Sequence, residues 1–226
     1  WGKGSVIPDF IHFSAGLWPG RQAIAHRKEA LAALKADIQA ILKSGQQYAA
    51  VGECGIDRYW NHAGAIDKGT CDLAGEEELF KAQLALAKQY GLAAVIHSSN
   101  GFEPTIRCID EIGWHKGVIH CFSYGKKEAE AFLERGWYIS FSGNCTFATT
   151  QTKKLKTAAL VQAVPLEKML LETDAPYLAP QPFRGKLNTP LLIEYTYAAV
   201  SEILGKSMEA LAEQVYQNCC SCFLVK

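Results

Sequence analysis

Residues 93–123 of the chain read AAVIHSSNGFEPTIRCIDEIGWHKGVIHCFS, and this stretch decides the fold. Its two ends, Ala93–His97 and Gly117–Cys121, are almost continuous runs of apolar residues. Such runs are typical of parallel strands that are buried on both faces. Between them, Pro104–Glu111 has the spacing of an amphipathic helix. The stretch therefore predicts a strand, a crossover helix and a second strand parallel to the first.

The same alternation of short apolar runs and longer amphipathic segments extends along the whole chain. The apolar runs are Asp9–Ala15, Tyr48–Gly52, Ala93–His97, Gly117–Cys121, Trp137–Phe141 and Met169–Leu171. The helical segments are His26–Lys43, Glu76–Tyr90, Pro104–Glu111, Lys126–Arg135, Thr150–Ala163, Pro190–Leu204 and Ser207–Asn218. Strict alternation of this kind predicts an α/β protein with right-handed crossovers.

An open doubly wound sheet and a closed (β/α)8 barrel both fit this pattern. No Gly-rich phosphate loop follows any run, which disfavours the dinucleotide-binding form of the open sheet. Polar residues at the C-terminal ends of several runs favour a barrel, because a barrel places its active site there. Only six strands are predicted, however, where a closed barrel has eight. We expect one domain over residues 1–226, with Asn61–Gly75 as a long loop over the strand ends.

The composition excludes a general attraction to nucleic acid or to an anionic membrane. Lys and Arg together number 23, as do Asp and Glu, so any attraction for phosphate must come from a local site. No apolar stretch approaches the ~20 residues of a transmembrane helix, so we expect no membrane association. The eight cysteines are irregularly spaced, which favours free thiols and a cytoplasmic protein. The group Cys219, Cys220 and Cys222 fits helix packing better than a metal clip, because no second pair accompanies it.

Four ionisable residues stand at the ends of four separate predicted strands: Glu53, His97, His120 and Asp174. A single histidine there is most often an isolated polar residue. Four such positions favour a ring of two imidazoles and two carboxylates at one mouth of the sheet, because ionisable groups after buried runs need partners. Nitrogen and oxygen donors of this kind suit zinc, manganese or magnesium.

Longer motifs around these residues are similar to the successive signatures of the TatD family. They are Gly52-Glu53-Cys54-Gly55-Ile56-Asp57, Val95-Ile96-His97-Ser98, Ile119-His120-Cys121-Phe122-Ser123, Leu171-Glu172-Thr173-Asp174-Ala175-Pro176-Tyr177-Leu178 and Arg184-Gly185-Lys186-Leu187-Asn188-Thr189-Pro190. The resemblance implies a distorted (β/α)8 barrel, one or two divalent metal ions (Mg, Mn or Zn) and phosphodiester hydrolysis of DNA. By motif match, the same four residues would be metal ligands, with Glu53 placed between two metals.

Two metals suit a phosphodiester because paired cations hold both the nucleophile and the leaving oxygen. Glu53 and Asp174 are therefore the expected catalytic residues, and Asp174 can also act as a general base toward water. Arg184 and Lys186 are candidates for holding substrate phosphate, although a solvated loop explains them equally well. Asp57 and Glu172 are candidates for orienting the histidine ligands from behind.

The chain departs from the family pattern at three places. The family's first strand ends in His-x-His, and no such pair occurs here. Together with six predicted strands and a start at Trp1, this leads us to expect that the first two strand–helix units are missing from the sequence. Where the family usually has Gly-x-His-Pro, this chain has Gly16-Leu17-Trp18-Pro19. The position after His97-Ser98 is usually arginine in the family and is Ser99 here. These two changes favour an altered substrate choice or weak activity.

The sequence thus predicts a divalent-metal-dependent hydrolase, most simply a deoxyribonuclease with DNA as its substrate and no obligate protein partner. Two alternatives stay open. The same metal ring can polarise a carbonyl, which fits a related barrel hydrolase acting on a small amide or ester. The absent His-x-His pair also fits a catalytically impaired relative that is kept for binding.

Overall fold

The computed structural model describes residues 8, 10–45, 47–61 and 72–224. Six strands form one parallel sheet in the order β1-β2-β3-β4-β5-β6. Their bounds are β1 Phe13–Ala15, β2 Tyr48–Asp57, β3 Ala93–Ser99, β4 Gly117–Ile119, β5 Tyr138–Phe141 and β6 Met169–Leu171. Sequential order with parallel pairing is the arrangement that the alternating sequence predicted, and it confirms the six expected strands.

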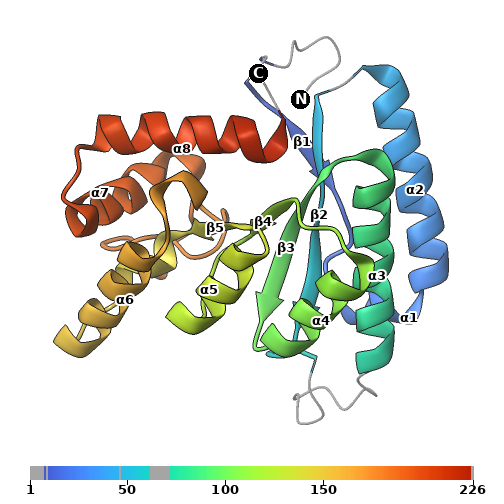
Figure 1. Cartoon of the computed structure of the whole chain (residues 1–226), viewed down its shortest axis with the longest axis horizontal. Coiled ribbons are helices and arrows are strands. Elements are labelled where there is room, and N and C mark those ends of the chain that lie inside the picture. Colours follow the sequence, from blue (N-terminus) through green and yellow to red (C-terminus); the bar gives the residue numbers. More distant parts are fainter. Residues whose placement is uncertain (1–7, 9, 46, 62–71, 225–226) are drawn as a thin grey trace.

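Helices connect successive strands and follow the last one (Figure 1). The α-helices are α1 Arg21–Ala25, α2 Arg27–Ser44, α3 Leu73–Tyr90, α4 Phe102–Ile112, α5 Lys126–Glu134, α6 Gln151–Ala163, α7 Ile193–Leu204 and α8 Met208–Phe223. Three 3-10 turns are η1 Gly143–Thr146, η2 Leu166–Lys168 and η3 Pro190–Leu192. Figure 1 shows α2, α3 and α4 beside the first three strands and α5 to α8 grouped around the later ones.

The core lies between the sheet and these helices. Its largest fully buried side chains include Trp137, Phe80 and Phe132. Cys222 belongs to this core and Cys219 packs against it, as the helix-packing interpretation of the C-terminal cysteines predicted. Burial of apolar side chains on both faces of the strands explains why the strand sequences are apolar runs without alternation.

Several predicted boundaries differ from the structure. The second strand, predicted as Tyr48–Gly52, runs on to Asp57, so Glu53 lies within it rather than at its end. Within the run Asp9–Ala15, only Phe13–Ala15 is a strand, because a turn with the bond Ile11 N–H to Pro8 O precedes it; Asp9 itself lies outside the described residues. The fourth strand ends at Ile119 rather than Cys121, whose backbone is left-handed (φ 47°).

The predicted loop Asn61–Gly75 also ends earlier than expected. Its residues 62–71 lie outside the described part of the chain. Helix α3 already begins at Leu73, because the Asp72 carboxylate accepts a hydrogen bond from Gly75 N–H and caps the helix.

The sheet is not closed within the described residues, where β1 and β6 are the two ends of the strand order. Because all six strands are parallel, their C-terminal ends lie at one edge, and the residues that follow each strand meet there. Among the described residues, none of the helices combines the length and the apolar character that a bilayer crossing requires.

Candidate metal centre

Glu53 reaches the mouth of the sheet through a β-bulge in β2. Gly52 pairs with Val95 and Cys54 pairs with Ile96, so Glu53 is the extra residue with no partner on β3. Gly52 has a φ of 146°, and a Cβ atom there would lie 2.6 Å from Val95 O. A glycine is therefore required before the bulge, and the bulge re-aims the next side chain. Glu53 is half-buried while its neighbours in the strand are buried.

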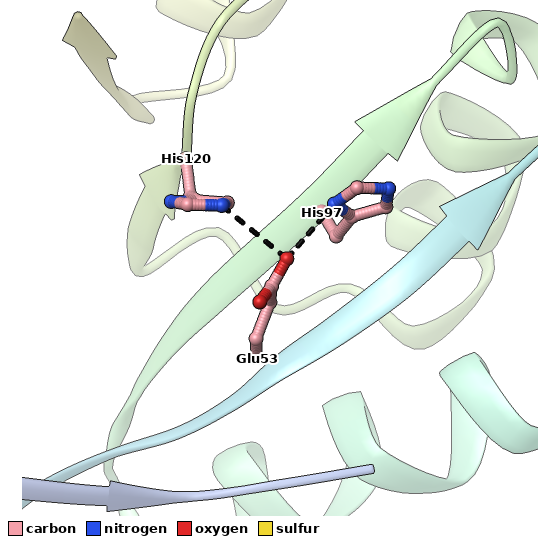
Figure 2. A group of neighbouring side chains, drawn as sticks. All are labelled: Glu53, His97 and His120. Carbon is pink, nitrogen blue, oxygen red and sulfur yellow. Dashed lines mark ion pairs between the residues drawn. The ribbon is translucent and has the colours of Figure 1, made fainter. Parts of the chain in front are cut away.

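Two histidines meet the Glu53 carboxylate at this edge (Figure 2). His97 lies near the end of β3, and its Nδ1 is 2.8 Å from Glu53 Oε1. His120 directly follows β4, and its Nε2 is 3.3 Å from the same oxygen. One ligand atom from each of the three residues lies within 4.8 Å of the others. The sequence predicted that these residues would meet, although Glu53 lies within β2 and not at its end.

Asp174, the fourth predicted ligand, lies beside this group. Its Oδ1 is 3.6 Å from His120 Nε2, and it stands in a left-handed backbone (φ 57°) three residues after β6 ends. The buried Asn188 amide holds this loop by donating to the carbonyl oxygens of Thr173 and Tyr177. Asp174 is thus placed at the open side of the group, with a looser contact than Glu53 makes.

Each histidine has a carboxylate behind it. His97 Nε2 is 2.9 Å from Asp57 Oδ2, in hydrogen-bonding geometry. His120 Nδ1 is 2.9 Å from Glu172 Oε1, close enough for an ion pair although the alignment is poor for a hydrogen bond. The other Glu172 oxygen accepts a hydrogen bond from Ser140. These contacts fix which ring nitrogen of each histidine faces Glu53.

The electrostatics of the group favour positive charge. Burial by itself lowers the pKa of His97, but contacts with Asp57 and Glu53 outweigh it and raise this pKa to about 9. Burial also lowers the pKa of His120, but contacts with Glu172 and Glu53 outweigh this effect and raise the pKa to about 11. Burial raises the pKa of Glu53, yet the two histidines lower it to about 2. Burial raises the pKa of Asp174, against the attraction of His120.

The donor set fits a divalent cation. Carboxylates outnumber imidazoles here, so the group carries negative charge that a divalent ion would balance. Ligand atoms about 2 Å from one tetrahedral ion lie roughly 3.4 Å apart, and the 2.8 and 3.3 Å contacts of Glu53 are near that spacing. Two nitrogens and carboxylate oxygens suit zinc, manganese or magnesium.

Arg184 and Lys186 do not join this group. The Arg184 guanidinium lies 4.4 Å from the centre of the Phe147 ring, and Lys186 Nζ lies 5.8 Å from that of Phe183. Both cations are exposed on the loop that Asn188 ties to the loop of Asp174.

Two other positions depart from the family pattern, Trp18 and Ser99. Trp18 lies against the His97 ring, and the Ser99 carbonyl accepts a hydrogen bond from Arg58 N–H.

Sequence reasoning missed the residues that support the centre from inside the fold. They are Ser140, Asn61, Glu76 and Gln83, all of which are buried. A signal existed for two of them, because Glu76 and Gln83 occupy the same helical stripe as the buried Phe80, Leu84 and Ala87. Polar residues on a buried stripe require partners, and here those partners are in the loops around the mouth.

The comparison with protein families agrees with this geometry. The family described as "TatD related DNase" matches residues 4–224. The chain belongs to the TatD family.

Among its TatD relatives is the "Uncharacterized metal-dependent hydrolase YabD" of Bacillus subtilis (strain 168), 32% identical over 93% of this chain and 76% of that protein. Another, of Edwardsiella piscicida, is named "3'-5' ssDNA/RNA exonuclease TatD" and is 34% identical over 80% of this chain and 64% of its own length. The solved structure of YJJV, a TatD homolog from Escherichia coli k12, has a TM-score of 0.80 and 27% identity, covering 95% of this chain and 77% of that one. These matches confirm the predicted α/β fold of the TatD type and a family of metal-dependent hydrolases.

Proposed function

We propose that this protein is a divalent-metal-dependent deoxyribonuclease, with Glu53, His97, His120 and Asp174 as its metal ligands. The observation that carries the proposal is the convergence of Glu53 Oε1 on one nitrogen from each histidine, toward the C-terminal edge of the parallel sheet. The relative named a single-stranded DNA and RNA exonuclease supports a phosphodiester substrate. Membership of a metal-dependent hydrolase family supports the metal.

One or two bound divalent ions would supply positive charge for the phosphate oxygens and lower the pKa of a water molecule. Glu53 and the two histidines hold this charge in place, because Asp57 and Glu172 fix the orientation of the imidazole rings. The half-buried Glu53 carboxylate faces both imidazole rings at once, so it is the ligand that two metal ions would share.

Asp174 has the position of a general base. It lies outside the tight group of three, and about a quarter of its side chain (23%) is exposed, so one of its oxygens can meet a water molecule while the other faces His120. Arg184 and Lys186, on the neighbouring loop, would attract the phosphates on either side of the cleaved bond without touching the ligands.

The test is nucleotide release from single-stranded DNA by the purified protein with magnesium or manganese. Glu53→Gln keeps the shape of the side chain but removes its charge, and we expect it to lower kcat/KM by at least about 1,000-fold, the scale on which a charge-stabilising group acts. Glu209→Gln is the matched control, since Glu209 is exposed on α8.

Three outcomes would overturn the proposal. Hydrolysis of small amides or esters without nucleotide release would make the protein a related barrel hydrolase. Absence of both stoichiometric metal and hydrolysis would make it an impaired relative. Nucleotide release that Glu53→Gln leaves intact would mean that the activity has another site.

A further inference from the structure

Two exposed indole rings lie on the loops that follow β1 and β2, at the edge of the sheet that carries the candidate metal centre. Trp18 follows β1 and Trp60 follows β2, and their exposed fractions are 39% and 60%. The centre of the Trp18 ring lies 5.6 Å from that of the proposed ligand His97, in an edge-on arrangement. Single exposed apolar residues are ordinary on protein surfaces. Two large rings on neighbouring loops, one of them against a proposed metal ligand, are a different case, provided that the fold holds the loops in place.

The backbone on both sides of Trp18 is fixed by buried amide side chains. Gln83, on α3, accepts a hydrogen bond from Leu17 N–H (2.6 Å) and donates one to Leu17 O (3.0 Å). Asn61 donates to Pro19 O at 2.6 Å. Gln83 and Asn61 are 0% and 3% exposed. Buried hydrogen bonds of this kind are costly to break, so Trp18 is held at the mouth while its ring stays partly exposed.

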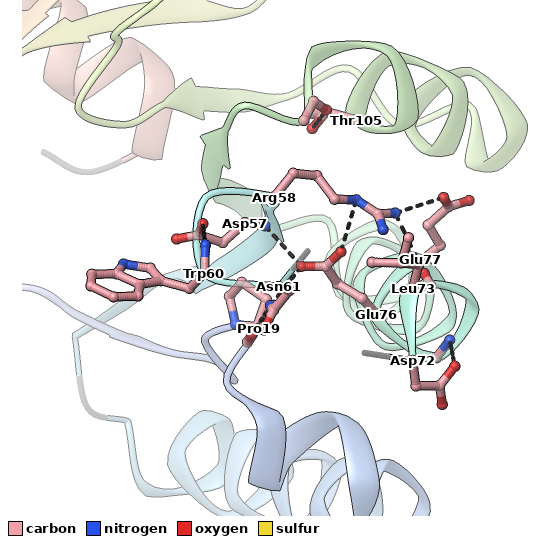
Figure 3. A network of polar contacts seen from close by, with 12 residues as sticks. Pro19, Asp57, Arg58, Trp60, Asn61, Asp72, Leu73, Glu76, Glu77 and Thr105 are labelled. Atoms are coloured by element: carbon pink, nitrogen blue, oxygen red, sulfur yellow. Dashed lines mark hydrogen bonds and ion pairs between the residues drawn. The ribbon is translucent and has the colours of Figure 1, made fainter. Parts of the chain in front are cut away.

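The turn that carries Trp60 is fixed by the same network (Figure 3). The Asp57 carboxylate accepts hydrogen bonds from Tyr59 N–H and Trp60 N–H, at 2.9 and 3.0 Å. The fully buried Glu76 accepts from Asp57 N–H and from the Asn61 amide, both at 2.9 Å. Figure 3 shows the Trp60 ring projecting away from this network.

The Asn61 amide therefore joins the two tryptophan loops, since it is next to Trp60 in sequence and bonds the residue after Trp18. Tyr59 adds a third ring, 5.0 Å from that of Trp60 and perpendicular to it. Aromatic side chains on a firmly held backbone lose little entropy on binding and stack with any base, because every base has a π-face. Such rings near a phosphodiester-cleaving centre suit the bases of an unpaired strand.

We propose that Trp18 and Trp60 form a stacking subsite for the nucleobases of single-stranded DNA next to the cleaved bond. The inference rests on the proposed nuclease function and adds a base-recognition element to it. It also gives a role to Trp18 where the family pattern has histidine: an indole ring offers a larger stacking face than an imidazole.

The test compares two phosphorothioate-linked strands that resist cleavage, one carrying thymines and one abasic, bound to the magnesium-loaded protein. Because stacking of one base contributes to the binding free energy, we expect the abasic strand to bind at least about tenfold more weakly. Trp18→Leu and Trp60→Leu should each shrink this difference, whereas Trp18→Phe should retain most of it. Tyr216→Leu is the matched control, because Tyr216 is an equally exposed aromatic (60%) on α8.

A small phosphodiester without a base reports separately on the metal centre. Thermal unfolding of Trp18→Leu and Trp60→Leu shows separately that the variants are folded. Equal binding of thymine-bearing and abasic strands by the wild type would overturn the stacking subsite and leave the nuclease function standing. Failure of the wild type to hydrolyse any phosphodiester would instead overturn the nuclease function.

Discussion

The two histidines of the candidate centre are supported in different ways. Behind His97, the Asp57 side chain is 3% exposed and accepts hydrogen bonds from two backbone amides. Behind His120, the Glu172 side chain is 22% exposed and has one aligned donor, Ser140. The first half of the centre is locked by a buried network, and the second faces the open side where Asp174 lies. The difference indicates that the His97 side of the centre is held more firmly than the His120 side.

The buried network on the His97 side should contribute most to stability. Glu76→Leu removes the acceptor shared by Asp57 N–H and the Asn61 amide, and it leaves Arg58 without its buried partner. We expect a loss of about 3–5 kcal/mol in the free energy of unfolding, measured by urea denaturation.

Glu78→Leu, on the same helix, is the control. Its ion pair with Arg27 is exposed (60% for the Glu78 side chain), so we expect a much smaller loss. Equal losses for the two variants would contradict the idea of a locked half.

Asp57→Asn should weaken divalent-metal binding by about 100-fold, near the upper end for groups behind metal ligands. The substitution removes the negative charge that orients the His97 ring and strengthens its other nitrogen as a donor to a metal ion. Titration calorimetry with manganese measures the change. Asp37→Asn, an exposed aspartate on α2, should leave the affinity unaltered.

Glu172→Gln should weaken metal binding by about tenfold, near the lower end of the same range. Its carboxylate is more exposed than that of Asp57, and its contact with His120 is not aligned as a hydrogen bond. Glu167→Gln, at an exposed position just before β6, serves as the control. A loss equal to or larger than that of Asp57→Asn would reverse the proposed order of the two halves.

An exposed ion pair between Asp110 and Arg135 should have the smallest effect on stability. Asp110 on α4 accepts two hydrogen bonds of 2.8 Å from Arg135, and this contact lowers the pKa of Asp110. Asp110→Asn should reduce stability by about 0.5 kcal/mol at neutral pH, because the pair is exposed.

The sign of the pH dependence follows from the lowered pKa of Asp110. The stabilisation is present above the pKa of an unfolded aspartate and is lost as the pH falls through the lower folded value. Thermal unfolding of both proteins at a series of pH values should therefore show the difference closing in acid. A difference that stays constant below pH 3 would mean that the Asp110 charge is not its cause.

The sequence predicted the strand ends better than the contacts behind them. Glu53, His97 and His120 were identified because each follows or ends an apolar run, and parallel strands bring such positions to one edge. The bulge that turns Glu53 toward both rings was not predicted, since it depends on the register between β2 and β3. Arg184 and Lys186 were selected from a motif alone, and their contacts are with aromatic rings outside the group.

By itself, the sequence determined the alternation of strands and helices and the residues presented at the mouth of the sheet. These features follow mainly from local periodicity, which depends on neighbouring residues. Only the tertiary structure decided that Glu76, Asn61 and Gln83 hold the loops of Trp18 and Trp60 in place. Those hydrogen bonds join residues 15 to 66 positions apart, and such pairings exist only once packing has fixed the distances between elements.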